Sequence, residues 1–175
     1  MSPATCYTIL PAPIGKLLLT ACSGQLTGLW VGGEKHCPDI HPLWQPDPAA
    51  FTAAASQLAE YFAGTRWDFT LPLAPAGTPF QQLAWSALRQ IPYGETRSYQ
   101  QQAAAIQRPS AVRAIGTANG RNPLSIIVPC HRVIGANGTL TGYGGGLPAK
   151  QWLLEHERCH RPFLPPDHGS GKPGS

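Results

Sequence analysis

The chain has 175 residues, enough for one or two small domains with a core, and its 42% hydrophobic content is ordinary for a globular protein. The net charge is +4, and no apolar run approaches the roughly 18 residues that span a bilayer. Five irregularly spaced cysteines argue against a disulfide framework and favour reduced thiols. We therefore expect a cytoplasmic protein with no signal peptide and no membrane association.

The charge is unevenly distributed along the chain. Residues 1–79 carry a net charge of −2, residues 80–135 carry +5 and residues 136–175 carry +1. A basic middle segment beside an acidic leader suggests a local face that binds a polyanion. On charge alone, however, a solvated basic surface remains the simpler explanation.

The first half predicts a small sheet with one helix. Short apolar runs between turn-forming residues predict four strands, at residues 7–10, 16–22, 26–31 and 67–73. A helix is expected to begin at Pro48, with Asp47 as its N-cap, and to stop at Gly64. Residues 72–77 are rich in proline and small residues, which is typical of a linker. We therefore place an α/β domain with an antiparallel sheet at residues 1–74 and expect it to be mainly structural.

The second half is predicted to be largely helical. Thr78-Pro79-Phe80-Gln81 has the pattern of a capped helix start, and that helix should run to Leu88. Two short helices, at 99–106 and 110–118, are separated by a tight turn at 107–109. This pattern predicts a helix-turn-helix, although any helical hairpin looks similar.

The remaining segments of the second half are a strand, a loop and a helix. Ser125–Val128 is predicted to be a short strand, followed by a glycine-rich loop and a last amphipathic helix that reaches Glu157. This domain should span residues 78–160, and the tail at residues 165–175 is expected to be disordered. The predicted fold class is therefore α+β.

Pro129-Cys130-His131-Arg132 is the segment most suggestive of chemistry. A thiol becomes a good nucleophile as a thiolate, which a nearby base or cation favours. Neighbours on an extended chain point to opposite sides, so a contact between Cys130 and His131 needs a turn or a bridging water. From these four residues alone, a buried structural cysteine beside a surface histidine is equally compatible.

The wider sequence resembles the O6-alkylguanine-DNA alkyltransferases, also called methylated-DNA–protein-cysteine methyltransferases, of bacterial type. The resemblance covers nearly the whole second half, in blocks at residues 78–81, 91–94, 98–99, 113–116, 122–135, 142–143 and 150–157. In the first half the recognisable pieces are Ile14-Gly15 and Tyr61-Phe62-Ala63-Gly64.

The resemblance implies a catalytic group of four residues. Cys130 would take the alkyl carbon, and His131 would remove the thiol proton through a water. Glu157 would orient His131, and Asn122 would hydrogen-bond near the thiol. The resulting thioether is stable, so each molecule would act once and be irreversibly inactivated. No cofactor is implied.

The resemblance also implies a DNA-binding face. The damaged guanine must be flipped out of the duplex to reach the thiol. Arg113 would fill the gap that it leaves, and Tyr99 would push on the neighbouring phosphate. Ser110 and Ala114 are expected on the same face. The partner would be double-stranded DNA containing O6-alkylguanine, with O4-alkylthymine as a second candidate, bound by a monomer that needs no protein partner.

The flipped base needs a pocket, and the resemblance assigns it two residues of the glycine-rich loop and two backbone carbonyls. Tyr143 and the backbone of Gly144 would line the pocket, and the carbonyls of Cys130 and Val133 would accept from the guanine amine. Gly144 stands where some relatives have a polar side chain, so any contact there would fall to the backbone.

Two departures from the family pattern concern the turn and a metal site. Gln107 stands where the family often has glycine in the helix-turn-helix turn. Cys22 matches one position of a zinc site found in some members, but the other ligands have no clear match. His36, Cys37 and His41 do not supply four ligands at regular spacing, so no metal is predicted.

Two alternatives remain open at the level of sequence. One is a non-reactive sensor of alkylated bases with the same fold, against which Cys130 argues. The other is a cysteine-dependent hydrolase, against which Arg113 and the +5 segment argue.

Overall fold

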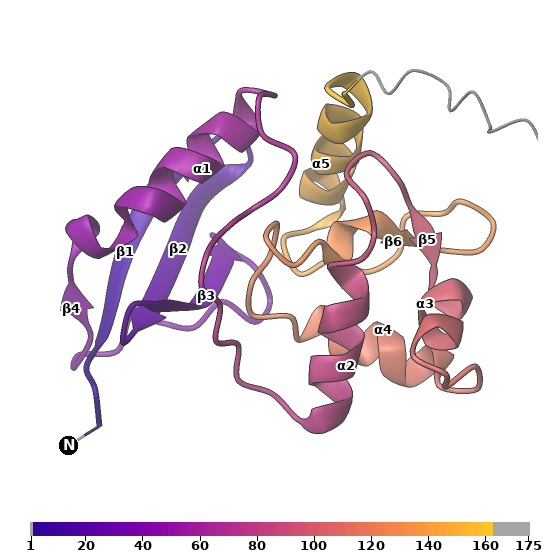
Figure 1. Ribbon diagram of the computed structural model, residues 1–175, viewed down its shortest axis with the longest axis horizontal. Helices are drawn as coiled ribbons and strands as arrows, with labels where there is room; N and C mark the ends of the chain where they lie inside the picture. Colours follow the sequence, from indigo (N-terminus) through magenta and orange to yellow (C-terminus); the bar gives the residue numbers. More distant parts are fainter. Residues whose placement is uncertain (1, 163–175) are drawn as a thin grey trace, which may run out of the picture.

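The computed structural model describes residues 2–162, so the tail predicted at residues 165–175 lies outside the described residues. In the first half, β1 (Thr5–Ala12), β2 (Gly15–Cys22) and β3 (Gln25–Val31) form an antiparallel meander. The two-residue β4 (Gln45–Pro46) pairs in parallel with β1, which gives the strand order β3-β2-β1-β4. One helix, α1 (Thr52–Phe62), lies across this sheet (Figure 1). The α+β class and the antiparallel sheet are thereby confirmed.

The helix of the first half ends as predicted but begins differently. Gly64 adopts a φ of 80° and terminates α1, as expected of a glycine after the last turn. The side chain of Asp47, however, makes no capping hydrogen bond. A 3-10 turn, η1 (Pro48–Phe51), precedes α1 instead, because the proline fixes the entry into the helix before a regular α-helical turn forms.

The strand predicted at residues 67–73 is wrong. Only Leu73 forms an isolated bridge, with Leu26 of β3. Upstream, the side chain of Gln57 bonds the backbone of Thr70, accepting from its N–H at 2.9 Å and donating to its carbonyl at 3.4 Å. A side chain of α1 thus satisfies backbone groups that a neighbouring strand would otherwise have bonded.

The described part of the second half, up to residue 162, contains four α-helices and a short parallel ladder (Figure 1). The helices are α2 (Pro79–Leu88), α3 (Tyr99–Ala105), α4 (Val112–Gly120) and α5 (Leu147–Cys159), and β5 (Arg97–Ser98) pairs with β6 (Val133–Ile134). A capping box at Thr78 starts α2 as predicted, and a second one at Ser98 starts α3. The predicted start of α4 at Ser110 is wrong by two residues, because the chain is still in the turn there.

The predicted helix-turn-helix is held together from inside. Gln102 of α3 and Asn119 of α4 exchange two amide hydrogen bonds, of 2.9 and 2.8 Å, and both side chains are buried. The indole of Trp85 in α2 donates to the carbonyl of Ala118 at 2.9 Å. Because buried polar groups need partners, these bonds fix the angle between the two helices.

Gln107 ends α3 in the left-handed conformation, with a φ of 61°. The N–H of Gln107 donates to Ala104 and that of Arg108 to Ala103, the pattern of a Schellman ending. Since a side chain costs roughly 1 kcal/mol in this conformation, Gln107→Gly is expected to raise the free energy of unfolding by up to about 1 kcal/mol. Urea titration measures the change; a loss of stability would contradict it.

The free edge of β3 binds the segment that leads to Cys130. The N–H of Leu29 donates to Pro123 at 2.7 Å, and the N–H of Ser125 donates to Leu29 at 3.0 Å. The strand predicted at Ser125–Val128 is wrong, because Ile126 has a φ of 74° and the chain continues in tight turns. An extended run would have carried Cys130 away from the sheet edge, whereas the turns keep it close.

Candidate active site

Cys130 lies in a buried turn that Asn122 holds together. The amide nitrogen of Asn122 donates to Sγ of Cys130 at 3.3 Å and to the carbonyl of Val128 at 2.8 Å. Its amide oxygen accepts from the N–H of Leu124 at 3.0 Å. Asn122 is itself buried. One side chain thus fastens both ends of the turn and touches the thiol.

The thiol is neutral at rest. Burial raises the pKa of Cys130 to about 11, and nearby Glu34 adds to the rise, while the Asn122 hydrogen bond and Lys150 oppose it. At pH 7 such a group is a thiolate in roughly one molecule in ten thousand. A nucleophilic reaction at Cys130 therefore needs a base that accepts the proton as the reaction proceeds.

His131, which follows Cys130 in the chain, is oriented by Glu157. Cys130–Arg132 form a 3-10 turn, η2, which supplies the turn that the sequence required. Nε2 of His131 lies 2.7 Å from Oε2 of Glu157 in α5. An ionised carboxylate only accepts, so Nε2 carries a hydrogen, and in the neutral imidazole the lone pair is on Nδ1. Nδ1 is buried and has no hydrogen-bond partner within residues 2–162.

Glu157 is the charged centre of this cluster. Arg132 donates from Nε to Oε1 at 2.7 Å and from Nη2 to Oε2 at 3.1 Å. Burial alone would raise the pKa of Glu157, but His131 and Arg132 outweigh it and hold that pKa well below its ordinary range. The carboxylate is therefore ionised at neutral pH and can stabilise a proton taken up by His131.

Sequence reasoning missed a further member of the cluster, Tyr61 of α1. Its hydroxyl donates to Oε2 of Glu157 at 2.6 Å, and its side chain is fully buried. The first half therefore reaches the His131–Glu157 pair directly. The only sequence signal was the block Tyr61-Phe62-Ala63-Gly64, which said nothing about which residue its tyrosine would meet.

The residues expected to form the base pocket lie on the loop before α5 and beside η2. Burial, and then the proximity of Cys130 and Glu34, raise the pKa of Tyr143 well above its ordinary value. The carbonyl of Val133 already accepts from the buried ammonium of Lys150 at 2.7 Å. A carbonyl has two lone pairs, so one remains for a ligand.

The comparisons with known proteins match both halves of the chain. Residues 5–75 match the family description "6-O-methylguanine DNA methyltransferase, ribonuclease-like domain", and residues 79–159 match "6-O-methylguanine DNA methyltransferase, DNA binding domain". The methylated-DNA–protein-cysteine methyltransferase of Mycobacterium tuberculosis (strain H37Rv) is 51% identical over 89% of this chain and 94% of its own. The chain belongs to the methylated-DNA–protein-cysteine methyltransferase family.

Further relatives agree with this membership. The constitutive methylated-DNA–protein-cysteine methyltransferase of Bacillus subtilis is 47% identical over 87% of this chain and 94% of its own. The crystal structure of Mycobacterium tuberculosis OGT in complex with DNA superposes with a TM-score of 0.84 and 50% identity, covering 90% of this chain and 95% of that one. The predicted family and enzyme class, and the assignment to DNA repair by alkyl transfer to a cysteine, are thereby confirmed.

The residues expected to touch DNA in this methyltransferase lie apart from the catalytic cluster, on the helix-turn-helix. Arg113 and Ala114 are exposed on α4, and with Ser110 they line a shallow groove beside the start of α2. Tyr99 opens α3, and its hydroxyl donates to the carbonyl of Thr141 at 3.3 Å. Tyr99 thus joins α3 to the loop that carries Tyr143.

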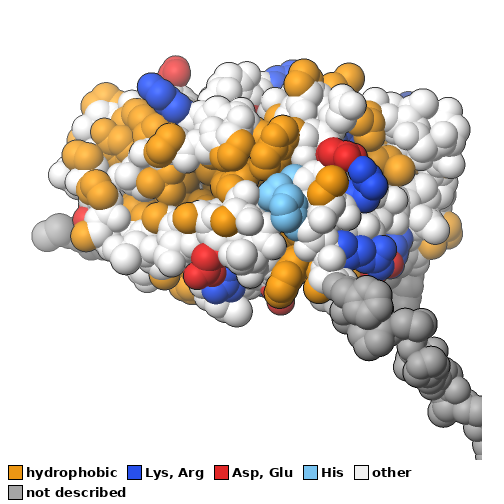
Figure 2. Space-filling model, turned by 90° about the horizontal axis from the view of Figure 1, so that it is seen from above, with side chains coloured by type: hydrophobic (Ala, Val, Ile, Leu, Met, Phe, Trp, Pro, Cys, Tyr) orange, Lys and Arg blue, Asp and Glu red, His pale blue; other side chains and the backbone are white. Residues whose placement is uncertain are grey.

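The side of the methyltransferase away from α4 carries few charged side chains. Figure 2 shows the molecule from above Figure 1, the side away from α4, where hydrophobic and uncharged side chains predominate and Lys and Arg are scattered.

No helix within residues 2–162 is long and apolar enough to cross a membrane. The same residues contain no group of three or more His, Cys, Asp or Glu side chains arranged to hold a metal ion.

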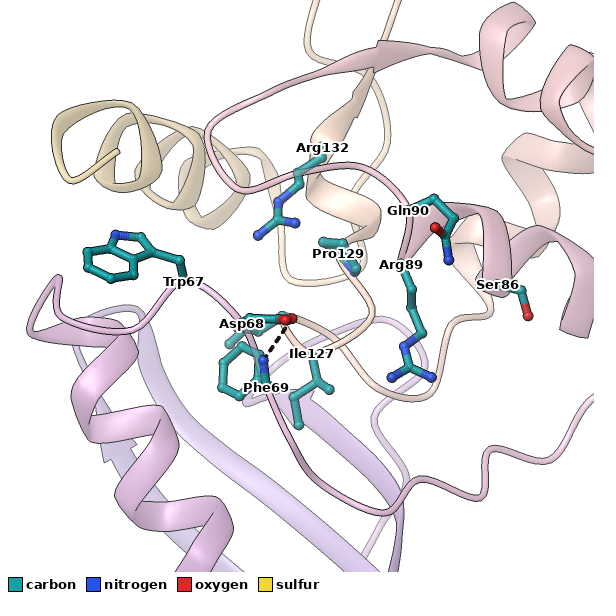
Figure 3. Close-up of a pocket in the computed structure, with 10 residues that line it drawn as sticks. Trp67, Asp68, Phe69, Ser86, Arg89, Gln90, Ile127, Pro129 and Arg132 are labelled. Carbon is teal, nitrogen blue, oxygen red and sulfur yellow. Dashed lines mark hydrogen bonds between the residues drawn. The ribbon is translucent and has the colours of Figure 1, made fainter. Parts of the chain in front are cut away.

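A separate pocket of about 410 Å³ borders the η2 turn (Figure 3). Its walls come from residues 67–69, from the end of α2 at Arg89 and Gln90, and from Pro129 and Arg132. Through Ile126, Ile127, Pro129 and Arg132 it borders the turn that holds Cys130, but Val133, Tyr143 and Gly144 do not line it. It is therefore not the pocket expected for the base.

Proposed function

We propose that the chain transfers the alkyl group from O6-alkylguanine in double-stranded DNA to Sγ of Cys130. The observation that carries this proposal is the buried thiol, bonded by Asn122 at 3.3 Å and preceding a histidine that Glu157 orients at 2.7 Å. Such a nucleophile, base and orienting carboxylate are what activation of a neutral thiol needs.

The proposed reaction is a single displacement. The bond between O6 and the alkyl carbon breaks as the bond from Sγ to that carbon forms. The thiol proton passes to Nδ1 of His131 through a water, and the imidazolium that results is stabilised by Glu157. The electron pair of the broken bond leaves with guanine. Because the thioether is stable, each molecule acts once, without a cofactor.

The base pocket in this proposal consists of Tyr143, Gly144 and the carbonyl of Val133. The hydroxyl of Tyr143 is buried near Ser125, but it forms no hydrogen bond with Ser125 or with any other group within residues 2–162, so it is available to a bound purine. The free lone pair of the Val133 carbonyl would accept from the guanine amine, while Lys150 holds that carbonyl in place.

The flipping of the base is assigned to the helix-turn-helix. Arg113, exposed on α4, would fill the gap in the stack, with Ser110 and Ala114 against the minor groove. Tyr99 would press on the phosphate next to the lesion. The two hydrogen bonds between the Tyr99 hydroxyl and Thr141 would then connect this DNA contact to the loop that carries Tyr143.

Arg113→Ala is expected to slow transfer from duplex DNA by roughly tenfold or more, because an extruded base that nothing replaces returns to the stack. Transfer from the free base O6-benzylguanine should change little, since no stack is opened. Single-turnover rates on both substrates measure this, with exposed Arg158 of α5 replaced by alanine as the control. Equal losses on both substrates would mean that Arg113 does not fill the gap.

The experiment that tests the function is intact-mass spectrometry after mixing the protein with a duplex carrying one O6-methylguanine. We expect one gain of roughly fourteen daltons, the mass of a methylene, on the peptide that holds Cys130. An unmodified protein that still binds the lesion would contradict the transfer and favour a sensor of alkylated bases.

Several further predictions stay proposals. They are the division into a structural domain at residues 1–74 and a DNA-binding, alkyl-transfer domain at 78–160, the monomeric state, the cytoplasmic location, and the absence of a metal, a cofactor and a protein partner. The contact of Tyr61 with Glu157 changes the first of these, because the first half then supports the catalytic cluster as well as the fold.

A further inference from the structure

Glu34, in the loop that follows β3, is a buried carboxylate that none of the residue roles above uses. It is 9% exposed. Its Oε2 accepts from the N–H of Val31 at 3.1 Å, and its Oε1 accepts from the hydroxyl of Ser125 at 2.9 Å. No salt bridge to Glu34 is found within residues 2–162. Burial without a cation raises its pKa to about 7. A group this costly to bury calls for a reason.

The carboxyl of Glu34 lies directly against Gly144. A Cβ placed on Gly144 would stand 2.5 Å from Oε1 and 3.0 Å from Cδ of Glu34. The backbone of Gly144 is outside the left-handed region, so its conformation does not itself require glycine. The N–H of Lys35 also donates to the carbonyl of Gly144, at 3.3 Å. Glu34 therefore occupies the space that a side chain at position 144 would need.

These contacts join the first half of the chain to the turns that lead to Cys130 and to the loop that carries Tyr143. Ser125 lies in the turns that lead to Cys130, and Gly144 directly follows Tyr143. Glu34 also contributes to the raised pKa of Cys130 and to that of Tyr143. A single carboxyl group thus touches the nucleophile turn and the loop that carries the pocket tyrosine.

We propose that Glu34 is a positioning residue for the base pocket: it holds Ser125 by a hydrogen bond and seats the 143–144 loop by taking the place of a side chain at Gly144. This inference rests on the proposed transfer to Cys130 and on the proposed pocket at Tyr143. It also accounts for the glycine at position 144.

The test is saturation kinetics of Cys130 alkylation by O6-benzylguanine, which enters the pocket without DNA. Glu34→Ala should raise the half-saturation concentration by about tenfold, as expected for the loss of one buried hydrogen bond, while the limiting rate changes less than threefold. Glu34→Gln keeps the shape and one acceptor, so it should stay within about threefold of the wild type. Glu60→Ala, at a half-exposed glutamate of α1 that is paired with Arg66, is the matched control.

A second measurement separates seating of the loop from general support of the fold. Gly144→Ala, made in the otherwise wild-type protein, should raise the half-saturation concentration because its Cβ meets the carboxyl of Glu34. In the Glu34→Ala background the same change should cost little, since the space is then free. A loss of folding alone would instead make the two substitutions additive.

The outcomes divide clearly. Rescue of Gly144→Ala by Glu34→Ala, together with near-normal saturation in Glu34→Gln, would support the inference. Additive losses, or an unchanged half-saturation concentration in Glu34→Ala, would overturn it while leaving transfer to Cys130 intact. A wild type whose Cys130 stays unmodified would overturn the proposed transfer and this inference with it.

Discussion

Cys130→Ala is expected to abolish alkyl transfer completely while DNA binding remains within about twofold of the wild type. Transfer needs a sulfur that can form the new bond, and alanine offers none. Binding should survive because the proposed DNA contacts lie on α3 and α4, on residues such as Arg113. Loss of the small Sγ from a turn that Asn122 also holds through Val128 should leave that turn in place.

The measurement is intact mass after reaction with a methylated duplex, alongside a binding titration on the same duplex. The matched control is Cys159→Ala, since Cys159 is an exposed thiol at the end of α5. This variant should gain the full roughly fourteen daltons. A mass gain in Cys130→Ala, or its loss in Cys159→Ala, would show that Cys130 is not the acceptor.

Glu157→Gln is expected to produce the largest combined loss of stability and rate. The buried carboxylate accepts from Tyr61, His131 and Arg132. A glutamine would leave the guanidinium of Arg132 buried without its counter-charge, which costs on the order of 3–5 kcal/mol in the free energy of unfolding. Transfer should fall by roughly a hundredfold or more, because the protonated His131 loses its stabilising partner.

The pH dependence of stability should identify the same charge. The native environment lowers the pKa of Glu157 below its ordinary value, so its contribution is complete above about pH 4.5 and is lost as the pH falls below it. In Glu157→Gln this part of the acid-induced loss should disappear, making the decline below pH 4.5 shallower. Urea titrations at several pH values measure it, and identical pH profiles in variant and wild type would contradict the assignment.

Two variants bracket this result. Glu155→Gln changes an exposed glutamate of the same helix, paired with Arg158 at the surface, and should cost less than about 1 kcal/mol. Tyr61→Phe removes only one donor to Glu157, so it should fold, lose about 1–3 kcal/mol and still transfer slowly. If Tyr61→Phe matched Glu157→Gln in rate, the hydroxyl rather than the carboxylate charge would control the cluster.

The sequence determined the elements whose signals are local. The capping boxes at Thr78 and Ser98 and the stop at Gly64 each depend on residues within a few positions, and all three are present. Local signals also misled. The apolar runs at 67–73 and 125–128 resembled strands, but a side chain of α1 and a set of tight turns satisfy their backbones instead.

Some residues of the candidate site could be named from the sequence, and others were found only in the tertiary structure. Cys130, His131, Asn122 and Glu157 were named through the family resemblance, and the structure pairs Asn122 with Cys130 and His131 with Glu157. Only the tertiary structure placed Tyr61 on Glu157 and Glu34 against Ser125 and Gly144. The hydrogen bond between Tyr61 and Glu157 joins residues 96 positions apart, and the one between Ser125 and Glu34 joins residues 91 positions apart. No local pattern could reveal either contact. Such contacts depend on how the edge of β3 and the face of α1 meet the second half, and that packing is decided by burial over the whole chain.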